Sequence, residues 1–189
     1  MGLWDALMGR SRPVRPNLDA LFALPTAAVT LQTAADLHPT GIGSVCYREA
    51  EGAAFARTQT DVVALLDADE GPAVERTADG YGFTWLVVRH DPSEMSALVT
   101  DLHAVNTTLE AEGFGPSLLC SVVGFADPAG GSLGLVYLYK QGTFYPFAPR
   151  GEQRRENLLE IRVRDLVSGD LPVEKELSRW MPLWGAPGL

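Results

Sequence analysis

The sequence predicts an α+β protein whose mostly antiparallel sheet is built from two hairpins plus additional strands, with helices packed on one face. Two pairs of strand-like runs indicate the hairpins: residues 73–77 with 81–89, and residues 117–125 with 133–140. Each pair is joined by a short polar turn, which is typical of a β-hairpin. Between the hairpins, apolar residues recur at helical spacing over residues 95–109, which predicts a long amphipathic helix.

Length, composition and charge limit the class of protein. The chain has 189 residues, of which 46% are hydrophobic and 21% charged, and its net charge is −9. A chain of this size and composition can bury enough apolar surface to fold without a disulfide or a metal, so we expect no cofactor. The negative charge repels phosphate groups and argues against nucleic acid as a general partner.

The first 16 residues are expected to form an arm outside the main body. Trp4 and Leu7 lie on one apolar face of a short helix over residues 2–9, after which two prolines favour an extended segment. A helix of two turns is marginal alone in water, so this face must dock on its own body, a partner protein or a membrane surface. Trp4 and Leu7 are therefore candidate partner-binding residues.

The next segments are expected to alternate between short helices and strands. Asn17 is placed to cap a short helix that ends before Pro25, and a short strand is expected at residues 29–31. A longer strand is expected over residues 41–48. Apolar residues then recur at helical spacing, which predicts an amphipathic helix over residues 54–69.

Short sequence motifs predict the turn of the first hairpin and the two ends of the long helix. The first hairpin is expected to turn at residues 78–80, where Asp-Gly lies between two β-prone runs. Asp91 is then placed to cap the helix, with Pro92 at its first position and Glu94 completing a variant of the capping box. Gly113 supplies the left-handed residue at which the helix stops.

The C-terminal third completes the sheet and adds one helix. The polar residues 127–132 form the turn of the second hairpin, and residues 143–147 extend the sheet by one strand. Residues 153–168 alternate partly like a strand, but their length and their Arg and Glu content favour a helix. This gives a single α+β domain over residues 17–170, followed by a Trp- and Pro-rich strap over residues 171–189.

The cysteines and the segment near the start bear on localisation. Cys46 and Cys120 lie far apart in apolar runs, so we interpret both as reduced core residues, although the sequence leaves a disulfide between them open. The first residues lack the apolar core of a signal peptide, and no run approaches the ~18 apolar residues that a membrane-spanning helix requires. We therefore expect a cytoplasmic protein without a transmembrane segment.

No motif predicts catalytic residues. Residues 130–134 match the G-x-S-x-G string of serine hydrolases, but the serine lies in a turn between two strands rather than before a helix. The histidines lack the spacing of metal ligands. An alternative hypothesis is a ligand site or enzyme site of dispersed residues, formed by His90, Asp91, Asn106 and Tyr145.

Aromatic residues near the C-terminus are the remaining candidates for partner binding. Phe144 and Tyr145 follow one another in the last predicted strand, and Trp180 and Trp184 lie in the strap. Aromatic side chains can anchor a partner because they bury a large area at small entropic cost. The alternative for Phe144 and Tyr145 is that they pack in the core under the C-terminal strap.

Several strings spread along the whole chain resemble a known family. They are MGLWDAL at residue 1, PNLDALFALP at 16, GIGSVC at 41, YGFTW at 81, DLHAVN at 101, LVYLYK at 135 and WGAPGL at 184. Together they resemble the PspA-associated proteins labelled PspAB. The order of elements is also similar to YbjN-like and secretion-chaperone-like α+β domains, which bind protein segments.

The resemblance implies a function through association rather than chemistry. It implies contact with PspA, a coiled-coil phage-shock protein that supports stressed membranes, and an accessory role in the envelope stress response. It carries no catalytic residue onto this sequence. We therefore expect a non-enzymatic protein that binds PspA or a related stress factor, with a small-molecule binder or an enzyme of dispersed residues as the alternative. A peripheral membrane contact through residues 1–15 also stays open, as does the oligomeric state.

Overall fold

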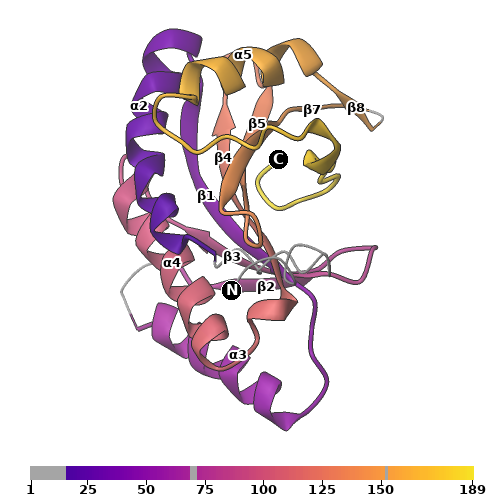
Figure 1. Cartoon of the computed structure of the whole chain (residues 1–189). Helices are drawn as coiled ribbons and strands as arrows, with labels where there is room; N and C mark the ends of the chain where they lie inside the picture. Colours follow the sequence, from indigo (N-terminus) through magenta and orange to yellow (C-terminus); the bar gives the residue numbers. More distant parts are fainter. Residues whose placement is uncertain (1–15, 69–71, 152) are drawn as a thin grey trace, which may run out of the picture.

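The computed structural model describes residues 16–68, 72–151 and 153–189, and it confirms the predicted α+β class (Figure 1). A six-stranded sheet has the strand order β2-β3-β1-β4-β5-β6, and all neighbouring strands run antiparallel. Its strands are β1 His38–Tyr47, β2 Glu75–Ala78, β3 Thr84–Arg89, β4 Leu118–Ala126, β5 Ser132–Leu138 and β6 Thr143–Phe147. A small separate hairpin pairs β7 Pro149–Arg150 with β8 Arg154–Arg155.

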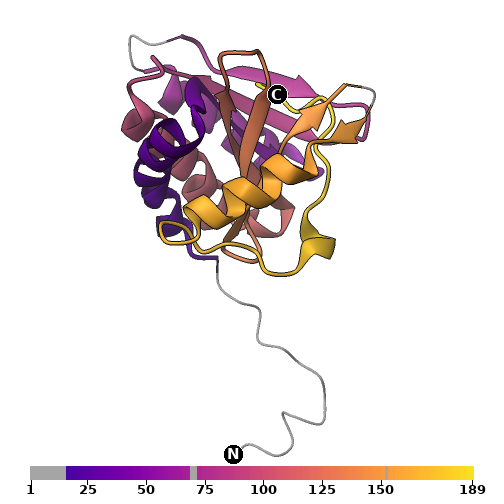
Figure 2. The same ribbon diagram turned by 90° about the horizontal axis from the view of Figure 1, so that it is seen from above.

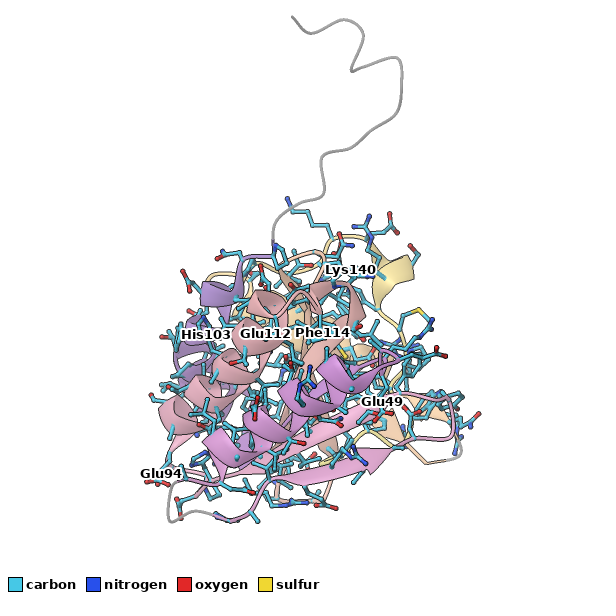
Figure 3. All side chains as sticks on the ribbon, turned by 90° about the horizontal axis from the view of Figure 1, so that it is seen from below. Glu49, Glu94, His103, Glu112, Phe114 and Lys140 are labelled. Carbon is cyan, nitrogen blue, oxygen red and sulfur yellow. The ribbon has the colours of Figure 1, made fainter. Side chains whose placement is uncertain are left out.

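Four α-helices pack against the sheet, and their apolar sides form one core with it. They are α2 Leu24–Ala35, α3 Ala53–Leu66, α4 Met95–Ala111 and α5 Asn157–Val167. Three short 3-10 helices complete the elements: η1 Leu18–Ala23, η2 Gly115–Ser117 and η3 Leu177–Arg179. α5 lies beside α2, which Figure 2 shows from above. α3 lies beside α4, near whose end Phe114 lies (Figure 3). Phe55 of α3 meets the Phe114 ring edge-on, with centroids 4.8 Å apart.

The sheet is apolar on both faces, but the helices cover only one of them. Successive side chains of a strand point to opposite faces, so Val45 joins the core under the helices whereas Cys46 joins a second core on the other side. The second core contains no residue of the four α-helices. Its cover is the chain after α5, which runs along the far side of the sheet (Figure 1).

The helix α2 corrects the prediction around Pro25. The short helix does not end there, and the strand predicted at residues 29–31 is helical, because α2 continues from Leu24 to Ala35. Proline lacks only an N–H that the first helical turn leaves unpaired, so it can begin a helix as readily as end one. The buried residues Leu24, Ala27, Ala28 and Leu31 follow helical spacing. Asn17 precedes η1 but makes no side-chain cap hydrogen bond.

The start of α4 and the loop of the first hairpin lie a few residues from their predicted positions. The Asp91 carboxylate accepts hydrogen bonds from the N–H and hydroxyl of Ser93, so it closes its own turn, and α4 begins after Glu94. The loop of the first hairpin is the five-residue segment 79–83, rather than the turn predicted at 78–80. In both places an aspartate carboxylate organises the turn by accepting backbone N–H groups.

The remaining predicted elements are confirmed to within a few residues. β1, α3 and both hairpins appear where they were expected, and β6 has the predicted bounds. The ambiguous segment before residue 168 is helical, as α5. Gly113 follows α4 with a φ of 85°, as the predicted stop requires. The arm of residues 1–16, with its expected helix, lies outside the described residues except for Pro16.

One described helical stretch, Leu18–Ala35, is long and apolar enough by length and composition to cross a membrane. In this structure its apolar side chains pack into the helical core, among them Leu21, Leu24 and Leu31, each at most 1% exposed. A core helix of a folded domain satisfies the same length and composition. The absence of a transmembrane segment therefore stays a prediction.

Candidate functional site

A cavity of about 590 Å³ lies on the sheet face opposite the helices, under the C-terminal segment. Its lining comes from five strands (β1, β3, β4, β5 and β6), from the 79–83 loop, from Gln153 and from residues 181–184. The lining residues are Cys46, Asp79, Tyr81, Phe83, Trp85, Leu119, Cys120, Leu138, Tyr145, Gln153, Met181, Pro182, Leu183 and Trp184. Its volume is within the range of about 300–1,000 Å³ that is usual for small-molecule sites.

Two thiols and an indole form part of the buried lining of the cavity. In the sheet register Cys46 lies directly opposite Cys120 on one side and Trp85 on the other. Both cysteines are buried and free, so the thiols form no disulfide in this structure. The hydrogen bond with Cys120, together with burial, raises the pKa of the Cys46 thiol far above its usual value. The Cys46 thiol is therefore neutral near pH 7.

Tyr145 of β6 closes the inner side of the cavity and contacts the C-terminal segment. Its ring stacks on Trp180, with centroids 5.9 Å apart. Its hydroxyl donates a hydrogen bond of 2.8 Å to the Met181 carbonyl. Burial raises the pKa of this phenol well above its ordinary value, so it stays protonated and keeps its donor.

The mouth of the cavity is formed by the loop of the first hairpin. The Asp79 carboxylate accepts the Trp85 indole N–H at 3.0 Å and the backbone N–H groups of Tyr81 and Phe83 at 2.8 and 3.0 Å. Desolvation pushes the pKa of Asp79 up, but these hydrogen bonds outweigh it and lower the pKa below its usual value. Asp79 is therefore an ionised group at the mouth that also fixes the loop.

A buried ion pair attaches the C-terminal segment to the body. Arg155 Nε lies 2.9 Å from Glu160 Oε1, and Arg155 Nη1 donates to the Trp180 carbonyl at 2.6 Å. Glu160 also accepts the Ala148 N–H at 2.9 Å, and its side chain is only 4% exposed. The Arg155 guanidinium lies 5.2 Å from the Phe147 ring centroid. Arg155 thus links α5, the end of β6 and the segment that covers the cavity.

The same segment also extends the edge of the sheet. The Phe144 N–H donates to the Pro172 carbonyl at 2.8 Å, and the Glu174 N–H donates to the Phe144 carbonyl at 2.7 Å. Trp180 then donates its indole N–H to the Glu174 carbonyl at 3.0 Å. Residues 172–174 therefore lie along β6. Trp180 is fixed by two hydrogen bonds, one from Arg155 to its carbonyl and one from its indole N–H to Glu174.

The chain end lies close to the sheet because β5 has a glycine beneath it. A Cβ atom at Gly134 would lie 3.0 Å from Leu189 Cδ1, which is tighter than most real contacts. Five residues before Leu189, Trp184 meets the Phe147 ring at a centroid distance of 5.1 Å.

Three of the six predicted partner-binding residues come together at this cavity. Tyr145 and Trp184 line it, and Trp180 is buried behind Tyr145. Phe144 points to the opposite face, where it meets Tyr137 in the helical core and has no exposed surface. The other two, Trp4 and Leu7, lie outside the described residues.

The dispersed set His90, Asp91, Asn106 and Tyr145 is not brought together. His90 Nε2 lies 2.6 Å from a carboxylate oxygen of Asp101, and Asp91 holds its own turn. Asn106 is buried on the helical side, where its amide donates to a hydroxyl of β4. Tyr145 belongs to the core on the other face of the sheet.

Sequence reasoning missed the residues at the mouth and the buried part of the cavity. Tyr81, Phe83 and Trp85 recur at a period of two, which in the strand predicted from residue 81 would place three aromatic side chains on one face. In the structure Tyr81 and Phe83 lie in the loop before β3, and all three line the cavity. That signal could have identified the cavity wall. The pairing of Cys46 with Cys120 could not be found in this way, because it depends on the register between strands distant in sequence.

A second hollow, of about 840 Å³, lies between α5 and residues 171–179. It is lined by charged groups that pair with each other, such as Arg179 with Glu174 at 3.4 Å and Arg164 with Asp165 at 2.7 Å. Among the residues the structure describes, no three His, Cys, Asp or Glu side chains gather where they could share a metal ion. The aromatic cavity is therefore the better candidate for a binding site.

The chain is thus an α+β protein with a cavity on the sheet face opposite its helices. The chain belongs to the PspAB family, PspA associated protein B, whose family model matches residues 1–188. No curated protein and no solved structure matches the chain. The family resemblance found in the sequence strings is thus confirmed over nearly the full length.

The buried ion pair predicts that Glu160→Gln destabilises the protein by about 2 kcal/mol or more, because the Arg155 charge loses its partner in a buried site. Hydrogen exchange of residues 180–189 should also rise. The matched control is Glu156→Gln, which removes an exposed pair with Arg150 and should cost less than about 1 kcal/mol. Urea unfolding measures both free energies; equal costs for the two variants would contradict the account.

Glu174 predicts a specific dependence of stability on pH. Burial pushes its pKa up, but hydrogen bonds from Glu176 N–H, Thr143 and Arg179 outweigh burial and lower the pKa below the ordinary 4.5. A lowered folded-state pKa stabilises the protein above the ordinary pKa, and this contribution is lost as pH falls through the folded value.

The unfolding free energy of Glu174→Gln should therefore fall furthest below that of the natural protein near pH 7. The gap should narrow as pH falls below about 4.5. Urea unfolding at a series of pH values measures it. A gap that widens on acidification would show that the carboxylate does not stabilise the fold in its ionised form.

Proposed function

We propose that this protein is a cytoplasmic accessory of the envelope stress response, which acts by contact with PspA or a related stress factor and performs no chemical step of its own. Membership of the PspA associated protein B family supports the association with PspA. The geometric support is the mouth of the aromatic cavity, where large apolar side chains remain exposed around a concave surface.

Tyr81 and Met181 are the best candidates for contact with a partner at this mouth, because both line the cavity and remain largely exposed. Their side chains are 63% and 58% exposed, and the half-buried Trp184 lies in the same lining. Exposed aromatic and methionine side chains around a pocket are typical of partner-binding surfaces, because they bury much area at small entropic cost. The surface fits an apolar segment of a protein partner.

A second candidate function is the binding of a small molecule inside the same cavity. The observation that favours it is a cavity of about 590 Å³ with a largely apolar lining and one carboxylate at the mouth. This site differs from the dispersed set expected from the sequence, with which it shares only Tyr145.

Contact through the cavity mouth predicts a defined effect of surface substitutions on PspA binding. The double variant Tyr81→Ser with Met181→Ser should weaken the affinity for purified PspA by about tenfold or more, as two anchor positions are lost. Isothermal titration of the two purified proteins measures the dissociation constant.

The matched control is Leu158→Ser on α5, which removes an equally apolar side chain that is 82% exposed and does not line the cavity. It should bind PspA like the natural chain. Equal weakening by the control and the double variant would refute the cavity mouth as the contact. Absence of saturable binding by the natural chain would refute the contact itself.

A further inference from the structure

The charge of the cavity lining is of one sign only. Among the described residues that line it, Asp79 is the one charged side chain, and no Lys, Arg or His is present. The whole chain is acidic as well, with a net charge of −9. Within the lining, an anionic ligand would meet a carboxylate of like charge, whereas a cationic ligand would meet its counter-ion.

The uncharged part of the lining also favours a cation with apolar substituents. Five aromatic side chains contribute: Tyr81, Phe83, Trp85, Tyr145 and Trp184. The face of an aromatic ring carries negative electrostatic potential, and cages of several rings are the usual site for substituted ammonium ions. The thiols of Cys46 and Cys120 and nearby leucines offer the remaining surface to apolar groups.

The molecule itself shows one cation on these rings. The Arg48 guanidinium lies 5.6 Å from the centroid of the Phe83 ring, although Arg48 does not line the cavity. Asp79 is held in place from three directions by the Trp85 indole and two backbone N–H groups, so its charge is fixed at the mouth without rearrangement.

We propose that this cavity binds a small organic cation free in solution, of the substituted-ammonium class, with its charge among the aromatic rings and Asp79 and its apolar part against the buried thiol-lined wall. The proposal rests on the second candidate function above and names its ligand class. Neutral apolar molecules would use the rings and the leucines but gain nothing from Asp79.

The test compares three probes on the full chain by isothermal titration calorimetry. They are (4-hydroxyphenyl)trimethylammonium, its uncharged isostere 4-tert-butylphenol, and the anion 4-hydroxybenzenesulfonate. The cation should bind about tenfold more tightly than the isostere, and the sulfonate should show no saturable binding.

Substitutions then separate the charge from the rings. Asp79→Asn should weaken binding of the cation about tenfold while the isostere changes less than about twofold. Its matched control is Asp127→Asn, because the Asp127 carboxylate accepts the N–H groups of Ala129 and Gly131 in the other hairpin but lies outside the lining. The control should leave both affinities unchanged.

Tyr81→Leu tests the rings with a side chain that is exposed and therefore not needed for folding. It keeps apolar bulk but removes the aromatic face, so it should weaken the cation several-fold and leave the isostere unchanged.

The possible contrary results point to different errors. Equal affinity for cation and isostere, unaltered by Asp79→Asn, would overturn the ligand class and leave small-molecule binding in place. No saturable binding of any probe would overturn the ligand class and the second candidate function together, but not the contact with PspA. An affinity for the cation that weakens as protein concentration rises would place a second copy of the chain in the cavity. Binding to phosphatidylcholine vesicles without binding of the free cation would place a lipid there. Either result would overturn the proposal.

Discussion

The structure depends on covering the second apolar face of a single sheet. Four helices occupy one face, and the side chains that alternate with that core are equally apolar on the other. Exposing such a face to water would cost roughly 25 cal/mol for each Å² of apolar area. The C-terminal segment covers it, and the buried Arg155–Glu160 pair holds that segment by binding the Trp180 carbonyl.

The cavity follows from the way this cover is built. An irregular segment lacks the periodic ridges of a helix, so it packs closely against the sheet only where individual residues allow it. Gly134 allows the chain end to approach β5, and Trp180 packs on Tyr145. Near the ends of β1 and β3 the cover leaves the aromatic cavity open. The binding site is therefore a consequence of closing a sheet with a strap rather than with helices.

Most of the fold could be predicted because its signals are local. The β-prone apolar runs of β4 and β5, the apolar stripe of α4 and Gly113 each specify an element within a few residues. The prediction at Pro25 was wrong because proline is compatible with both the end and the beginning of a helix, and only the packing of α2 decides between them.

The site was harder to predict because it depends on the register between paired strands and on the face of the sheet to which each side chain points. Phe144 and Tyr145 are adjacent in sequence and were expected to act together, yet a strand turns neighbouring side chains to opposite faces. The period of two was enough to foresee that separation. The meeting of Cys46 with Cys120 and Trp85 required the pairing of three strands, which no local pattern specifies.

The most direct test of this account is an NMR measurement of nuclear Overhauser effects between aromatic rings of the C-terminal segment and of β6. If the segment closes the second face, protons of Trp184 should show cross-peaks to Phe147, and those of Trp180 to Tyr145, as centroid distances of 5.1 and 5.9 Å require. Absence of both sets, with narrow random-coil resonances for residues 180–189, would contradict the closed face and the cavity that it forms.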